Sequence, residues 1–186
     1  MDTRVLVGLI IVALVVIALV VWSSMRKRRS EELRERFGPE YDRAVEEHQD
    51  RRSAEGALKE REERVQALQI RPLSAEQRGR FDEEWRSVQA RFVDDPTGAT
   101  TAADRLVGEV MEARGYPVGD FEQRAADISV GHPQVVEHYR AAHQIALRNE
   151  RGEAGTEDLR QALVHYRALF QDLLETRETA ATEVQR

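Results

Sequence analysis

Histidines and paired carboxylates are the residues of this sequence most able to do chemistry. The five histidines are His48, His132, His138, His143 and His165. A helix that binds zinc usually presents two ligands on one face, but His138 and His143 are five residues apart and lie about 140° apart around a helix axis. No histidine follows a Glu by three residues, as the di-iron bundles require. The sequence therefore predicts no metal site and no cofactor.

The remaining candidates for catalysis have structural explanations. Asp94 and Asp95 could serve as general acid and base or bind a cation, but their place just before Pro96 is typical of a helix cap. His143 falls on an apolar face beside Tyr139, which indicates a packed histidine. The chain has no cysteine, no G-x-S-x-G motif and no phosphate-binding loop. These absences favour a protein without catalytic activity.

The run Val5–Trp22 contains eighteen residues without a charge, an amide or a proline. At about 1.5 Å of rise per residue a helix over this run spans roughly 27 Å, so it is predicted to cross a bilayer and to contact lipid. The predicted membrane flank is Arg4, Trp22, Arg26, Lys27, Arg28 and Arg29. Its basic residues gather after the run, which predicts a single-pass protein of the inner membrane with the N-terminus outside and a cytoplasmic body. A cleaved signal peptide is the alternative, but no A-x-A site precedes Met25.

Charge limits the class of partner. The whole chain carries a net charge of -6, and from Ser30 onward 23 basic residues face 33 acidic ones. A surface of that sign repels nucleic acid, whose phosphates need a basic face. We therefore expect a protein partner and no nucleic acid.

The rest of the chain predicts an all-α fold, an antiparallel helical bundle that follows the N-terminal helix. The predicted parts are an anchor with its basic flank over 1–29, a charged helical stalk over 30–69, a bundle over 70–178 and a frayed tail over 179–186. Predicted helix ends are a break at Gly38 and Pro39, and caps at Ser74, Asp95, Asp120 and Thr156. Apolar stripes with helical spacing hold the bundle together, as in Phe81, Trp85, Val88 and Phe92.

Five short segments of the sequence resemble those of a known family. They are LRERFGPEYDRAV, QARFVDDP, ARGYP, FEQRAADISV and HYRALF. Together they resemble an uncharacterised family of bacterial single-span membrane proteins with a cytoplasmic all-helical domain. The resemblance implies a bacterial inner-membrane setting and names no site.

The predicted function is that of a membrane-anchored interaction or scaffold module, which positions a cytoplasmic protein partner at the inner membrane. If the bundle packs its own stripes inward, the stalk is the surface left for a partner. The candidate docking residues are Tyr41, Val45, Leu58, Arg61, Arg64 and Val65. The stalk could instead fold onto the bundle as a structural helix. The alternative function is a helical bundle that senses a ligand or binds a hydrophobic one.

Overall fold

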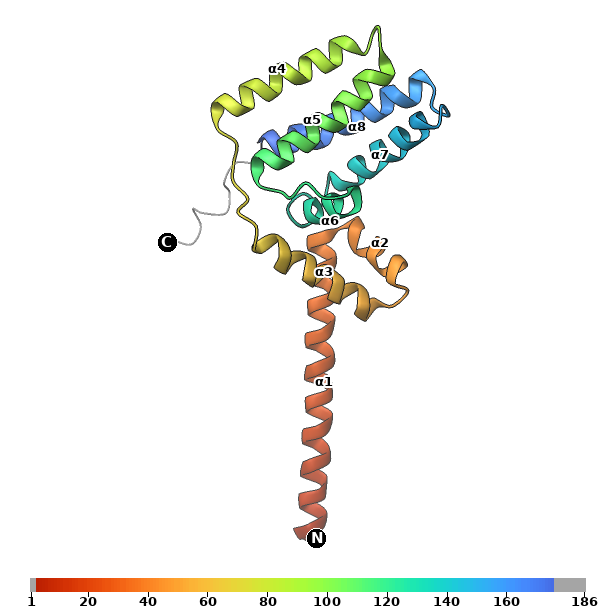
Figure 1. The fold of residues 1–186 in the computed structure, drawn as a ribbon. Coiled ribbons are helices and arrows are strands. Elements are labelled where there is room, and N and C mark those ends of the chain that lie inside the picture. The colour runs from red at the N-terminus through yellow and green to blue at the C-terminus, as the bar shows by residue number, and fades with distance from the viewer. Residues whose placement is uncertain (1–2, 176–186) are drawn as a thin grey trace. The chain divides into compact units, whose positions relative to one another are not determined.

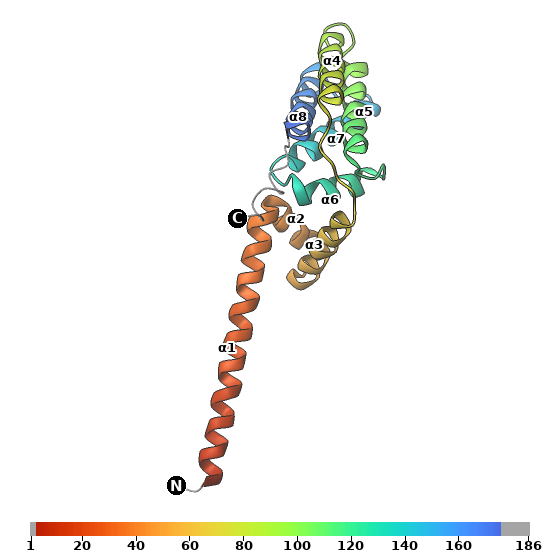
Figure 2. The same ribbon diagram turned by 90° about the vertical axis from the view of Figure 1, so that its left-hand side faces the viewer.

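The computed structural model describes residues 3–175, and within the first helix it leaves out the side chains of residues 3–13, 15, 19 and 26. The described residues form eight helices and no strand, so the predicted all-α fold is confirmed (Figure 1, Figure 2). The helices are α1 (Thr3–Phe37), α2 (Pro39–His48), α3 (Arg51–Gln66), α4 (Ala75–Arg91), α5 (Pro96–Arg114), α6 (Phe121–Gly131), α7 (Val136–Glu150) and α8 (Thr156–Glu175). The tail predicted over 179–186 lies outside the described residues.

The predicted membrane-spanning helix over Val5–Trp22 is contradicted. Within the described part of the chain, no helix combines the length and the apolar surface needed to cross a bilayer. α1 has 35 residues, but its described apolar side chains are soon followed by charged ones, which hydrocarbon excludes. Most side chains of Val5–Trp22, like those of Arg4 and Arg26, lie outside the description. The predicted single-pass location at the inner membrane rested on this helix, so it is not supported either.

The chain divides into two compact units, residues 1–58 and 59–186, and the boundary falls inside α3. In unit 1, α1 ends at Phe37 because Gly38 takes a positive φ of 51°, which glycine adopts at little cost, and Pro39 starts the next helix. This confirms the predicted break. The apolar core of unit 1 is Phe37, Tyr41, Ala44, Ala54 and Leu58.

The stalk predicted as one element over 30–69 contains the end of α1 and the two helices α2 and α3. Gln49 takes a left-handed conformation with φ of 53° and ends α2. Asp50 then caps α3, because its Oδ2 accepts a hydrogen bond of 2.8 Å from the backbone N–H of Ser53. The sequence held this signal, an Asp just before the first helical residue, but a run of good helix formers surrounds it.

Unit 2 is a helical bundle whose predicted caps are confirmed at three helices. Ser74 and Gln77 form a reciprocal capping box at the start of α4. Asp95 and Asp120 each accept a hydrogen bond from a backbone N–H three residues later, at 2.9 and 2.8 Å. Gly115 ends α5 with φ of 99°, where an added Cβ would come within 2.5 Å of a backbone carbonyl oxygen.

The core of the bundle is made by the stripes that the sequence displays. α5 packs against α4 and α8, and α7 packs against α8, so these four helices share one apolar interior (Figure 1). Trp85 of α4 stacks on Phe170 of α8 with ring centroids 4.7 Å apart, and Tyr139 meets Tyr166 edge to face at 6.4 Å. Phe92 of the predicted stripe is the exception, since α4 ends before it.

Candidate functional site

The six predicted docking residues differ in their exposure to solvent. Tyr41 and Leu58 are buried, so neither can receive a partner at the surface. Three others are half-buried, namely Val45, Arg61 and Val65. Arg64 is exposed, but its guanidinium binds the buried carboxylate of Asp127 at 2.8 Å. The predicted set is therefore not a single free surface.

Glu55 of α3 joins the helices of unit 1. Its Oε1 accepts hydrogen bonds from the Ser30 hydroxyl at 2.5 Å, the Tyr41 hydroxyl at 2.9 Å and Arg51 Nε at 3.1 Å. Burial opposes ionisation, but these hydrogen bonds outweigh it and hold the pKa of Glu55 below its usual value. The ionised carboxylate thus ties α1 and α2 to α3, which explains why Tyr41 is buried.

A groove lies beside this carboxylate in unit 1. It has a volume of about 520 Å³. The lining residues are Trp22, Ser23, Lys27, Ser30, Asp50, Arg51, Arg52 and Glu55. Asp50 and Glu55 are already engaged in the helix cap and the hydrogen-bond network, so the charges left to attract a ligand are mainly basic. The groove therefore suits an anionic group.

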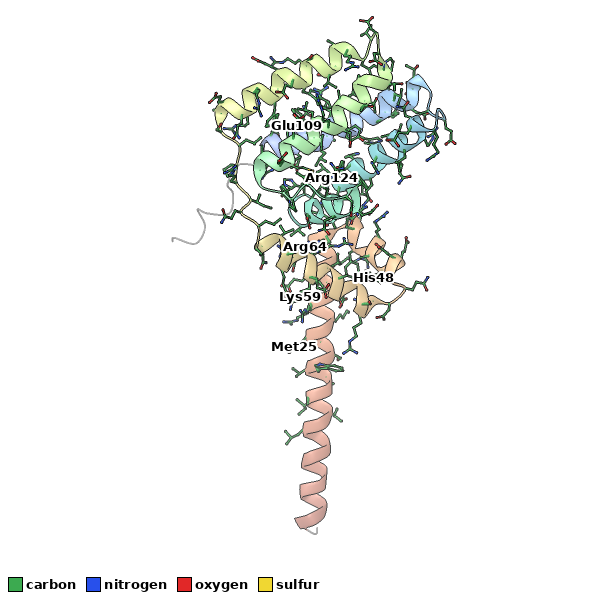
Figure 3. All side chains as sticks on the ribbon, viewed as in Figure 1. Met25, His48, Lys59, Arg64, Glu109 and Arg124 are labelled. Atoms are coloured by element: carbon green, nitrogen blue, oxygen red, sulfur yellow. The ribbon has the colours of Figure 1, made fainter. Side chains whose placement is uncertain are left out.

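The apolar side chains of α1 next to the groove face solvent. Seven of them are between 51% and 65% exposed in this chain. They are Leu14, Val16, Ile17, Val20, Val21, Trp22 and Met25. Figure 3 labels Met25 at the end of this apolar segment, beyond which the helix becomes basic. A contiguous exposed apolar surface of this kind marks a site of interaction.

Asp95 of the predicted acid pair is a helix cap. Asp95 binds the backbone N–H of Gly98 through Oδ1 and Arg91 through Oδ2, at 2.9 and 2.6 Å. The Gly98 hydrogen bond first, and Arg91 second, lower the pKa of Asp95. A carboxylate so engaged has little capacity to take up a proton, which favours the cap over the catalytic interpretation.

His143 is packed as its apolar face suggests. Its ring stacks on Phe121, with centroids 3.6 Å apart. Burial lowers the pKa of His143, so the ring favours its neutral form.

His132 and Asp172 form a contact that resembles half of a catalytic triad. The Nδ1 atom of His132 meets the carboxylate of Asp172, while Nε2 faces Arg114 at 3.4 Å. Arg114 is itself buried and donates to the carbonyl of Leu173 at 3.1 Å. Both ring nitrogens are therefore occupied, and neither is free to act on a substrate. The cluster fixes the end of α8 to the ends of α5 and α6.

A second group of polar atoms is buried between α5, α6, α7 and α8. Four of its buried atoms have no hydrogen-bond partner at an acceptable distance and angle within the described part of the chain. They are the hydroxyl oxygens of Tyr139 and Tyr166, Oδ1 of Asp104 and Nε of Arg124. Burial raises the pKa of both tyrosines, and the nearby Asp104 carboxylate raises that of Tyr166 further. Such atoms usually bind ordered water or a ligand.

Sequence reasoning missed one pair of histidines. His138 of α7 and His165 of α8 are 27 residues apart in the chain, yet their Nδ1 atoms are 3.0 Å apart. No local spacing signals this pair, because only the packing of α7 on α8 creates it. Among the described residues, no group of three or more His, Cys, Asp or Glu side chains could hold a metal ion.

Neither the family models, nor the curated proteins, nor the solved structures contain a match to this chain. The resemblance noted from the sequence therefore stays a prediction, and function must be argued from the site itself.

Proposed function

We propose that this chain is a helical interaction module, and that unit 1 binds a protein partner through the exposed apolar segment of α1 and the adjacent groove. The observation that carries the proposal is the exposure of seven large apolar side chains between Leu14 and Met25. Single exposed apolar residues are normal on a protein surface, but a continuous segment of them is not.

The size of this surface matches what association requires. Burial of one Val, Leu or Ile side chain contributes roughly 1.5–3 kcal/mol, whereas association costs about 4–15 kcal/mol in lost freedom. A partner must therefore cover most of the seven side chains, and not just a few of them, before the gain from burial exceeds this cost. Trp22 is the expected anchor, since Trp is enriched among the residues that dominate binding energy.

The charges around the segment indicate the chemistry of the partner. Arg28, Arg29 and Arg52 make no ion pair with any side chain that the structure describes. Lys27 makes only a long contact of 3.9 Å with Glu31, and both of these side chains are mostly exposed. A partner segment with an apolar face and acidic residues beside it would complement both features.

Charge reversal tests this proposal. We expect the double substitution Arg28→Glu with Arg52→Glu to lower the recovery of crosslinked partner about tenfold, because rim charges steer association. The melting temperature should stay unchanged, since these arginines support no described contact. The matched control reverses Arg86 and Arg167, two exposed arginines of the bundle.

Equal recovery of crosslinked partner from the test and control variants would show that Arg28 and Arg52 take no part in docking. A lower melting temperature in the test variant alone would show that these arginines support the fold, and the loss of partner would then follow from unfolding.

A second candidate function is the binding of a small polar molecule inside the bundle. The buried polar atoms of Asp104, Arg124, Tyr139 and Tyr166, whose hydrogen bonding is incomplete among the described residues, favour it. Ordered water satisfies such groups in many proteins, so this candidate ranks second. A hydrophobic ligand finds less support. Two hollows on the surface of the bundle, of about 460 and 210 Å³, are lined mainly by charged and polar side chains.

A further inference from the structure

We propose that His138 and His165 bind a divalent transition-metal ion between α7 and α8. The two Nδ1 atoms face each other at 3.0 Å, and the rings lie 28° from parallel with centroids 5.1 Å apart. The site is separate from the partner surface proposed for unit 1, and it needs no part of that surface.

The spacing of the nitrogen atoms suits a shared ion. Zinc binds imidazole nitrogen at about 2.0–2.1 Å, so two ligands of a tetrahedral zinc ion lie about 3.3 Å apart. Two adjacent ligands of a square-planar copper ion at a similar distance lie about 2.9 Å apart. The observed 3.0 Å falls between these values. The separation of the two nitrogen atoms therefore needs little change, whereas the rings must turn so that both lone pairs point at the ion.

The fold holds the two rings in place. Each histidine is followed by a fully buried tyrosine, Tyr139 or Tyr166, and these two tyrosines contact each other across the same helix pair. The buried tyrosines fix the rotation of α7 and α8 at this level. The pair is thus largely preorganised, which reduces the entropy lost when an ion binds.

A change of tautomer frees both Nδ1 atoms for an ion. In the hydrogen-bonded pair one Nδ1 donates its proton to the other. On metal binding that ring must carry its proton on Nε2 instead. His138 is exposed, so an ion can enter from solvent.

The donor set selects the class of ion. Imidazole nitrogen suits Zn²⁺, Cu²⁺ and Ni²⁺, whereas Mg²⁺ and Ca²⁺ prefer oxygen. Two described protein ligands leave the other coordination positions to water or to a group from a second molecule.

Equilibrium dialysis of the full chain against Zn²⁺ at neutral pH tests the proposal. We expect one ion per chain, with a dissociation constant below about 1 mM. His138→Ala and His165→Gln should each weaken binding at least about tenfold. His48→Ala is the matched control, because His48 is an exposed histidine at the end of α2 and should leave binding unchanged (Figure 3).

A thermal melt gives a second measurement. Zn²⁺ should raise the melting temperature of the wild type and of His48→Ala, but not that of the two other variants, because an ion that binds only the folded state stabilises it. Wild-type affinity in His138→Ala, or no binding by the wild type, would overturn the proposal.

Discussion

Trp85→Ala is expected to lower the free energy of unfolding of the bundle by about 3–5 kcal/mol, the usual cost of removing a large aromatic side chain from a core. Trp85 is 5% exposed and stacks on Phe170, so its removal leaves a cavity between α4 and α8. The indole Nε1 has no hydrogen-bond partner within the described part of the chain, so the expected loss comes from packing alone.

Denaturant unfolding followed by circular dichroism measures this change. Trp85→Phe is the matched control, since it keeps an aromatic ring against Phe170 and forfeits no hydrogen bond. Arg86→Ala, at the exposed neighbouring position, should change the free energy of unfolding by less than about 0.5 kcal/mol. A loss below roughly 1 kcal/mol in Trp85→Ala would contradict a core position for this side chain.

Arg64→Met is expected to destabilise unit 2 by about 2–4 kcal/mol, because it leaves a buried carboxylate without its cation. Asp127 is fully buried and accepts hydrogen bonds from Arg64 Nε and Gln123 Nε2, each at 2.9 Å. Its second oxygen has no partner within the described residues. The Arg64 side chain is 41% exposed, so water screens part of the interaction and the effect falls short of a fully buried pair.

A double-mutant cycle isolates this interaction. Asp127→Asn should remove the charge that needs Arg64, so the double variant should be more stable than Arg64→Met alone. The coupling energy should reach about 1–3 kcal/mol in chemical denaturation. A coupling near zero would mean that Arg64 is free at the surface, as the docking prediction required. A coupling energy of about 1–3 kcal/mol would show that Arg64 stabilises the fold.

The sequence predicted most of the bundle because its signals are local. Ser74 with Gln77, Asp95 with Pro96 and Asp120 with Gln123 each lie within one turn of helix, and the structure confirms all three helix starts. The same reasoning found the packed position of Trp85. A stripe at spacings of four and three has one face, and that face must be buried.

What the sequence did not predict depends on contacts between distant residues. Tyr41 was predicted to be a docking residue because its helix has few apolar positions, but its hydroxyl binds Glu55 fourteen residues later and the ring is buried. Arg64 reaches Asp127 across 63 residues, and His138 meets His165 across 27. The membrane-spanning helix was predicted from a local apolar run, and the described part of the chain does not support it.

The central claim, that unit 1 binds a protein partner through α1, is tested most directly by photo-crosslinking in the native cell. A photoreactive residue in place of Trp22 should yield a defined protein adduct. The same residue in place of Val93, which is 83% exposed in the bundle, should yield little. Equal yields at the two positions, or adducts of the Trp22 position with lipid and no protein, would contradict the claim.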